Sequence, residues 1–221
     1  MSPKPEPATI CNYDWEEQLF TEGCVVVAGV DEVGRGCLAG PVFAAAVVLR
    51  RGDIPDGIDD SKKLPRPRRE ELAVEIHSRA LAVAIARVEH DEIDRINILQ
   101  ASILAMKKAV SSLNPVPDAL LIDALRLPGV DCRQHGIIGG DAKCVSIGAA
   151  SIVAKVARDQ VMREYGKIYP EYGFDTNVGY GTATHLEALK KFGPTEIHRM
   201  TFRGVAKPEE ADNYPIEQGL F

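Results

Sequence analysis

Two neighbouring carboxylates end an apolar run early in the sequence, and a glycine-flanked arginine follows them directly. In "VAGVDEVGRGCLAG" (27–40), Asp31 and Glu32 come after β-branched and small apolar residues. Adjacent residues of a regular strand point to opposite faces, so both acids share one site only if the strand stops or bends there. Breaks of local folding rules cluster where function overrides folding convenience, which makes this segment the first candidate site.

Two further acids stand in similar places. Asp123 ends the apolar run "DALLID" (118–123), and Asp141 follows two glycines shortly before a long predicted helix. Carboxylates gathered at strand ends repel one another unless a positive charge lies between them. Mg²⁺ and Mn²⁺ suit such oxygen-rich sites, and two ions about 4 Å apart can clamp an in-line phosphoryl displacement. The alternative for any one of these acids is a helix cap or a solvated strand end.

The glycines first suggest a phosphate-binding loop, but the pattern fails. "GVDEVGRG" (29–36) has Arg35 where the P-loop needs lysine and Gly36 where it needs a hydroxyl. Glycine also lets a backbone approach a ligand closely. Exposed amides and carbonyls at such a place could reach a ribose 2′-hydroxyl, the group by which proteins distinguish RNA from DNA.

The elements that position these residues alternate between strands and helices, which predicts a single α/β domain. A polar loop covers 51–69, and the first two strands are joined too tightly for a parallel crossover, so we expect a mixed sheet. The predicted strands are 24–31, 41–49, 81–88 and 118–123. The predicted helices are 69–80, 96–113, 149–169 and 183–193.

Composition limits the possible partners and environment. The 221 residues carry a net charge of −6, so a nucleic-acid partner requires a local basic surface, for which "SKKLPRPRR" (61–69) is the candidate. Five cysteines without C-x-x-C spacing argue against a disulfide framework or zinc site and favour a reducing cytoplasm. No run is long and apolar enough for a membrane span, and the first residues do not form a secretory signal.

Eight blocks of the chain, in the family's order, resemble bacterial ribonuclease HII. They are "GVDEVGRGCLAGPV", "DDSKKL", "INILQASILAMKKAV", "ALLIDA", Gly-Asp at 140–141, "AASIVAKVARD", "GYGTATH" and "GPTEIHRMTF". The resemblance implies an α/β, RNase H-like fold with a five-stranded mixed sheet flanked by helices. The expected organisation is an N-terminal extension with a short helix (1–22), a catalytic domain (23–205) and a C-terminal tail (206–221).

The resemblance also implies an activity. The family hydrolyses the RNA strand of RNA–DNA hybrids and cuts 5′ to ribonucleotides embedded in duplex DNA, leaving a 3′-hydroxyl and a 5′-phosphate. Such cleavage serves ribonucleotide and RNA-primer removal, and it implies Mn²⁺ or Mg²⁺ as cofactor, two ions per site with substrate bound. The rivals are a DNA-only nuclease of the same fold and a non-catalytic hybrid-binding protein, which would need no cluster of acids.

The family's functional positions are carried over one by one onto matching residues of this sequence. The four catalytic and metal-binding carboxylates would be Asp31, Glu32, Asp123 and Asp141. The residues that recognise the 2′-hydroxyl and the ribonucleotide would be Gly34, Arg35, Gly36 and Tyr180. The contacts to the nucleic-acid backbone would come from Ser61, Lys62, Ser151 and Lys155.

Histidines and the chain end complete the predictions. No pair of histidines has metal-ligand spacing. His185 follows Tyr180 by five residues and could orient it, while His198 is expected to hold the C-terminal segment. The ending "IEQGLF" (216–221) loosely resembles peptides that bind the bacterial sliding clamp, with packing against the domain as the alternative. We expect a cytoplasmic monomer without a membrane partner.

Overall fold

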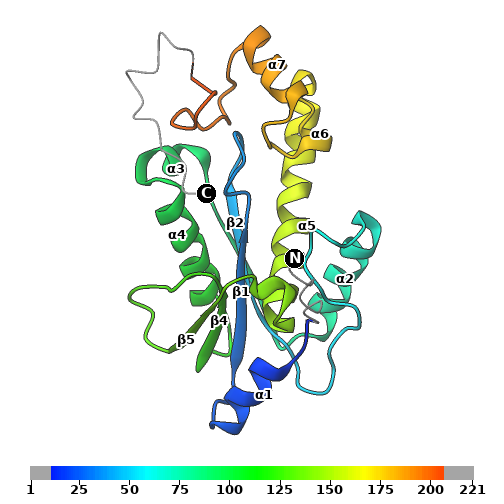
Figure 1. Cartoon of the computed structure of the whole chain (residues 1–221), viewed down its shortest axis with the longest axis vertical. Helices are drawn as coiled ribbons and strands as arrows, with labels where there is room; N and C mark the ends of the chain where they lie inside the picture. The colour runs from blue at the N-terminus through cyan, green and yellow to red at the C-terminus, as the bar shows by residue number, and fades with distance from the viewer. Residues whose placement is uncertain (1–10, 207–221) are drawn as a thin grey trace, which may run out of the picture.

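A mixed five-stranded sheet forms the centre of the molecule (Figure 1), as predicted. The computed structural model describes residues 11–206. The strand order is β3-β2-β1-β4-β5, with β1 antiparallel to β2 and parallel to β4. Strand β3 is antiparallel to β2, and β5 is parallel to β4. The strands are β1 (Val27–Val33), β2 (Val42–Val48), β3 (Ala82–Val88), β4 (Ala119–Asp123) and β5 (Arg133–Ile137).

Helices cover both faces of the sheet. In Figure 1, α3 and α4 lie on one side of β1 and β2, and α5 with α2 lies on the other. Strand β2, "VFAAAVV", is buried along its whole length because both of its faces contact helices. The helices are α1 (Asp14–Thr21), α2 (Arg66–Arg79), α3 (His90–Ile96), α4 (Ile98–Ser111), α5 (Val145–Ile168), α6 (Phe174–Asn177) and α7 (Ala183–Phe192), with short 3₁₀ turns η1 (Gly140–Ala142) and η2 (Pro170–Tyr172).

Beyond one end of the sheet, the second half of α5 packs with η2, α6, α7 and the segment 193–206 (Figure 1). An aromatic cluster fills the space between them, including Tyr172 and Phe174, whose rings stack at 5.5 Å between centroids. The segment 37–40, which leads from β1 into β2, joins this part of the molecule to the sheet. Its residue Ala39 pairs with His198 through an isolated antiparallel bridge.

The structure corrects several predicted boundaries. Strand β1 does not stop at Asp31 but continues through Glu32 to Val33, paired with β2 throughout. Helix α2 begins at Arg66, inside the predicted loop, since a proline within the first helical turn gives up no hydrogen bond there. Helix α5 begins at Val145, four residues early. Strand β5, "RQHGI", and helix α3 were not predicted, because polar, partly exposed sequences lack a clear hydrophobic period.

No helix within residues 11–206 is long and apolar enough to cross a membrane. The tail 206–221 falls almost entirely outside the described residues, and so does the predicted clamp-binding segment 216–221.

Candidate active site

The two central parallel strands bring Asp31 and Asp123 to the same end of the sheet. Val30 of β1 pairs with Ile122 of β4, so the two aspartates occupy the next register position. Asp123 Oδ1 accepts a hydrogen bond of 2.8 Å from the amide of Gly140. This bond holds turn η1 against the end of β4, and Asp141 is the next residue of that turn. Segments far apart in sequence thus bring three carboxylates together.

Asp31 is the most enclosed of these acids, with only 5% of its surface exposed. Its carboxylate accepts hydrogen bonds from the Glu32 amide, at 2.8 Å, and from the Ser151 hydroxyl on α5. The Ser151 hydroxyl in turn lies 2.9 Å from that of Ser61, and both serines are buried. Burial raises the pKa of Asp31 well above its usual range, and the charges of Glu32 and Asp123 raise it further.

Glu32 leaves β1 on the opposite face, as a regular strand requires. Its Oε1 pairs with Arg35 Nη1 at 3.2 Å, whereas its buried Oε2 has no hydrogen-bond partner among the residues described. Burial raises the pKa of Glu32, and Arg35 partly opposes that rise. Strand β1 therefore does not stop between the two acids, since its pairing with β2 continues to Val33. The charge of Asp123 acts on both Asp31 and Glu32.

Asp141 completes the cluster from the side of η1. Lys62 Nζ lies 3.7 Å from its Oδ2. Burial, followed by the charge of Asp60, raises the pKa of Asp141, and Lys62 opposes that rise. The lysine side chain is 76% exposed, so its ammonium stays accessible to solvent and to ligands.

We define the carboxylate cluster as Asp31, Glu32, Asp123 and Asp141. Three of them have raised pKa values because burial and like charge disfavour their ionised forms. An oxygen-rich, electron-rich group with an unpartnered buried oxygen is the donor set that Mg²⁺ and Mn²⁺ prefer, so the residues fit a divalent cation. Within residues 11–206, no three His, Cys, Asp or Glu side chains lie close enough together to hold an ion, and Arg35 and Lys62 pair with two of the cluster's carboxylates.

The segment that follows β1 is built around glycine. Gly34 has φ of +93°, and a Cβ there would lie 2.2 Å from Nε of the buried Arg158. Gly36 has open space where a side chain would be. Cys37 pairs with Tyr180 through an isolated antiparallel bridge, which brings the half-exposed Tyr180 beside the glycine segment. The four residues predicted to recognise a ribonucleotide therefore lie together.

Two buried arginines support this segment, and the sequence did not predict the burial of either. Arg158 donates to the carbonyl of Pro41 at 3.0 Å, and Arg199 donates to the carbonyls of Arg35 and Gly40, both at 2.9 Å. Neither is exposed. No sequence signal distinguishes a buried arginine from the surface arginines that are far more common.

The predicted backbone contacts divide into two kinds. Lys62 is exposed, as a phosphate-binding residue must be. Lys155 is only 14% exposed and bonds Asp159 at 2.6 Å, and Arg69 also pairs with Asp159. The remaining arginines of the basic segment pair with glutamates of α2, so the segment 61–69 presents much less free positive charge than its composition indicates.

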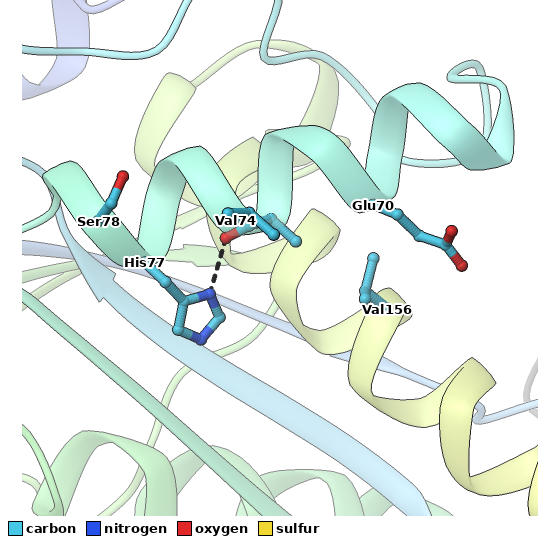
Figure 2. Close-up of a pocket in the computed structure, with 6 residues that line it drawn as sticks. Glu70, Val74, His77, Ser78 and Val156 are labelled. Carbon is cyan, nitrogen blue, oxygen red and sulfur yellow. Dashed lines mark hydrogen bonds between the residues drawn. The ribbon is translucent and has the colours of Figure 1, made fainter.

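A hollow of about 460 Å³ lies elsewhere, between α2 and α5 (Figure 2). Its lining is almost entirely apolar, and His77 Nδ1 donates to the Ala73 carbonyl of its own helix at 2.7 Å. The side chain of Glu70, at its rim, pairs with Arg66 and Arg163. This hollow holds no convergent acids, and the carboxylate cluster remains the candidate active site.

Known proteins resemble this chain over most of its length. The family model for ribonuclease HII matches residues 28–205. A ribonuclease HII from Cereibacter sphaeroides is 55% identical over 195 residues, which are 87% of this chain and 92% of that protein.

Solved structures share the fold as well. The ribonuclease H2 from Pyrococcus horikoshii has a TM-score of 0.70 and 26% identity, covering 86% of this chain and 98% of the other. The RNase HII in the PCNA:RNase HII complex from Archaeoglobus fulgidus has a TM-score of 0.66 and 26% identity, covering 79% and 92%. The sheet, with its acids at one end, is thus an RNase H-like fold, and the chain belongs to the ribonuclease HII family of type 2 ribonuclease H endonucleases.

Proposed function

We propose that the carboxylate cluster hydrolyses the phosphodiester on the 5′ side of a ribonucleotide, within duplex DNA or an RNA–DNA hybrid, and leaves a 3′-hydroxyl and a 5′-phosphate. The observation that supports this most directly is the register of β1 and β4. It places Asp31 beside Asp123, with the Gly140 amide holding η1 and Asp141 against them. The glycine segment 34–36 leaves the same strand end, so the acids and a ribose-sensing backbone lie next to each other.

The four acids Asp31, Glu32, Asp123 and Asp141 would hold the divalent cation, Mn²⁺ or Mg²⁺, with two ions present when substrate is bound. Bound cations of this kind supply a nucleophile at neutral pH and neutralise charge on the departing 3′-oxygen. The protein's own contribution is to hold the carboxylates ready. Ser151 and the Glu32 amide fix Asp31, and the Gly140 amide fixes Asp123.

Recognition of the ribonucleotide falls to the neighbouring segment. The backbone of Gly34, Arg35 and Gly36 would contact the 2′-hydroxyl, and the ring of Tyr180 would stack on the sugar that follows. Gly36 is exposed and has open space where a side chain would be, which keeps the backbone accessible there, whereas Gly34 is buried against Arg158. Backbone N–H and C=O groups that bind a 2′-hydroxyl reject a deoxyribose in its place, because these polar groups are then left without a partner.

The four predicted backbone contacts take different parts in this proposal. Lys62 would contact a phosphate, which positions the duplex without reading its sequence. Ser61 and Ser151 are buried and hydrogen-bonded to each other. Because the Ser151 hydroxyl also donates to Asp31, the two serines would help to hold that carboxylate in place. Lys155 is paired with Asp159 four residues later in α5, so it would stabilise this helix instead of contacting the nucleic acid.

A cleavage assay tests the proposal. The substrates are an end-labelled DNA duplex with one ribonucleotide, an all-DNA duplex and an RNA–DNA hybrid, each with Mn²⁺, Mg²⁺ or chelator. We expect one cut, 5′ to the ribonucleotide, only with metal. The Asp123→Asn variant should bind the duplex but not cut it, whereas Asp131→Asn, an exposed acid outside the cluster, should cut normally. Equal cutting of the all-DNA duplex, or normal turnover by Asp123→Asn, would refute the proposal.

The C-terminal residues 216–221 provide a proposed partner contact. Their sequence, "IEQGLF", resembles clamp-binding peptides, and a relative from Archaeoglobus fulgidus has been solved in complex with PCNA. We infer that this segment binds the sliding clamp and that the enzyme acts as a cytoplasmic monomer. Deleting residues 216–221 should abolish co-elution with the clamp while cleavage of free duplex is unchanged. Clamp binding by the truncated protein would rule out residues 216–221 as the binding segment. A dimer mass in light scattering would rule out a monomer.

A further inference from the structure

Two buried histidines lie next to each other, and one of them contacts the backbone of Tyr180. His185 of α7 and His198 have exposures of 0% and 1%, and their Nε2 atoms lie 3.0 Å apart. The aromatic rings of Tyr172 and Phe174 pack against both imidazoles. No carboxylate bonds either ring in the part of the chain that the structure describes, so the pair is not of the catalytic His–Asp kind.

The hydrogen-bond partners fix the position of every proton in the pair. The Thr195 amide donates to His198 Nδ1 at 2.8 Å, and a backbone amide cannot accept, so this nitrogen carries no hydrogen. Neutral His198 must therefore have its hydrogen on Nε2 and donate it to His185 Nε2. His185 then carries its own hydrogen on Nδ1, and that nitrogen lies 2.9 Å from the Tyr180 carbonyl, which only accepts. One directional chain of three bonds runs from Thr195 to Tyr180.

The turn that ends this chain is strained. Val178 has φ of +45°, an unfavourable value for a β-branched residue, and Gly179 follows at +88°. Strained conformations persist only where the surroundings enforce them. Arg158 bonds the Val178 carbonyl, the Leu38 amide bonds the Gly179 carbonyl, and His185 bonds the Tyr180 carbonyl.

The same hydrogen-bond chain is linked to two residues that directly follow the glycine segment 34–36. Cys37 bridges to Tyr180, and Ala39 bridges to His198. His185 therefore lies between the two residues, Tyr180 and His198, that hold this part of the chain. Because Tyr180 and the residues after Gly36 share this support, a change in the pair alters where the Tyr180 ring stands relative to the glycine backbone.

We propose that His185 and His198 are positioning residues for ribonucleotide recognition: their ordered hydrogen-bond chain fixes the backbone of Tyr180 and so the place of its ring. This inference rests on the proposed role of Tyr180. The chain holds only while both imidazoles are neutral, since a further proton would set two N–H groups against each other. Burial, together with the charges of His185 and His90, lowers the pKa of His198 to about 4, so His198 is neutral at pH 7.

The protonation pattern is measured directly on the intact, unmodified protein. Long-range ¹H–¹⁵N correlation spectra distinguish protonated from unprotonated ring nitrogens. At pH 7 we expect the Nε2–H tautomer for His198 and the Nδ1–H tautomer for His185. The reverse tautomers, or a charged ring in either residue, would refute the proposed hydrogen-bond chain, whether or not Tyr180 contacts the substrate.

The positioning role is tested by a double-mutant cycle on the single-ribonucleotide duplex. His185→Phe keeps an aromatic ring in the cluster but removes both hydrogen bonds, and Tyr180→Ala removes the stacking ring. Loss of a stacked ring raises KM by about ten-fold or more. We expect His185→Phe to raise KM several-fold with kcat nearly unchanged, and to have no further effect in the Tyr180→Ala background.

A matched control separates positioning from packing. Tyr172→Phe removes a 2.6 Å hydrogen bond to the Gly193 carbonyl within the same aromatic cluster but lies outside the chain to Tyr180. It should leave KM unchanged. Equal effects of His185→Phe with and without Tyr180 would overturn the positioning role. An unchanged KM in Tyr180→Ala alone would instead refute the proposed contact of Tyr180 with the substrate. The ¹H–¹⁵N spectra test the hydrogen-bond chain independently of that contact.

Discussion

Two buried polar clusters contact the chain before and within the segment 34–40, and they differ in how completely their polar atoms are paired. In the carboxylate cluster, Asp31 and Glu32 have raised pKa values, and one glutamate oxygen has no partner in the described residues. In the histidine pair, both imidazoles have lowered pKa values and every ring nitrogen has a partner. Burial therefore disfavours the ionised form in both places, but only in the histidine pair does every side-chain polar atom have a partner.

The difference indicates which polar cluster is suited to binding a ligand. A satisfied neutral network is complete by itself and serves to fix the backbone around it. A cluster of like charges with an unpartnered oxygen is stabilised when a cation joins it. Arg35 and Lys62 lie beside this cluster and partly oppose the rise in the pKa of Glu32 and of Asp141.

The strongest test of the contrast removes one charge from the carboxylate cluster. Asp31→Asn should lower kcat by more than about 10²-fold, since a group that stabilises developing charge is lost. The same variant should raise the midpoint of thermal unfolding in chelator, because a buried carboxylate surrounded by like charges is replaced by a neutral amide. Asp131→Asn is the control. A lower midpoint, or retained turnover, would contradict this view of the cluster.

The second test titrates the histidine pair. His198 has a pKa of about 4 in the folded chain and about 6.5 when unfolded, so the unfolded chain binds more protons between these values. Stability from this residue is present above about pH 6.5 and is lost as the pH falls to about 4. The loss amounts to at most about 3 kcal/mol. Urea unfolding of the wild type and His198→Phe across this range measures it, and parallel pH curves for the two proteins would argue against it.

The third test adds the missing charge to the carboxylate cluster. A ligand that binds only the folded state at ten times its Kd stabilises that state by about 1.4 kcal/mol. Mn²⁺ should therefore raise the unfolding midpoint of the wild type, and chelator should reverse the rise. Asp123→Asn should lose most of this response, whereas His198→Phe should keep it. A response in Asp123→Asn equal to that of the wild type would show that the ion binds elsewhere.

Sequence patterns predicted the centre of this fold better than its borders. Strand β2 and helix α4 follow clear apolar patterns because they are packed against other elements. Strand β5 is polar and lies at the sheet edge, so no alternation revealed it. The continuation of β1 through Glu32 was missed because two acids look like a strand end, whereas here they lie within the paired strand.

The sequence predicted the parts of the candidate site that depend on residue type, but not the parts that depend on which side chains are buried or paired. Acids at the ends of apolar runs indicated the cluster, and the structure brings Asp31 and Asp123 to one sheet end. The i,i+4 spacing of Lys155 and Asp159 within α5 allows their ion pair, but the sequence does not show that Lys155 is mostly buried while Lys62 is accessible. That difference in exposure depends on tertiary contacts.

That distinction leads to the smallest expected effect, a comparison of Lys62→Met with Lys155→Met. Lys62 is exposed, and its 3.7 Å pair with Asp141 contributes little to folding. Losing one phosphate contact should weaken duplex binding several-fold at all sequences and reduce the salt-dependence slope by about 1. Lys155→Met should leave that slope unchanged but lower the unfolding midpoint, because Asp159 loses its closest cation. Fluorescence anisotropy across a salt series, with catalytically inactive Asp123→Asn as background, measures both slopes. If Lys155→Met changed the slope and Lys62→Met did not, the roles drawn from their exposure would be reversed.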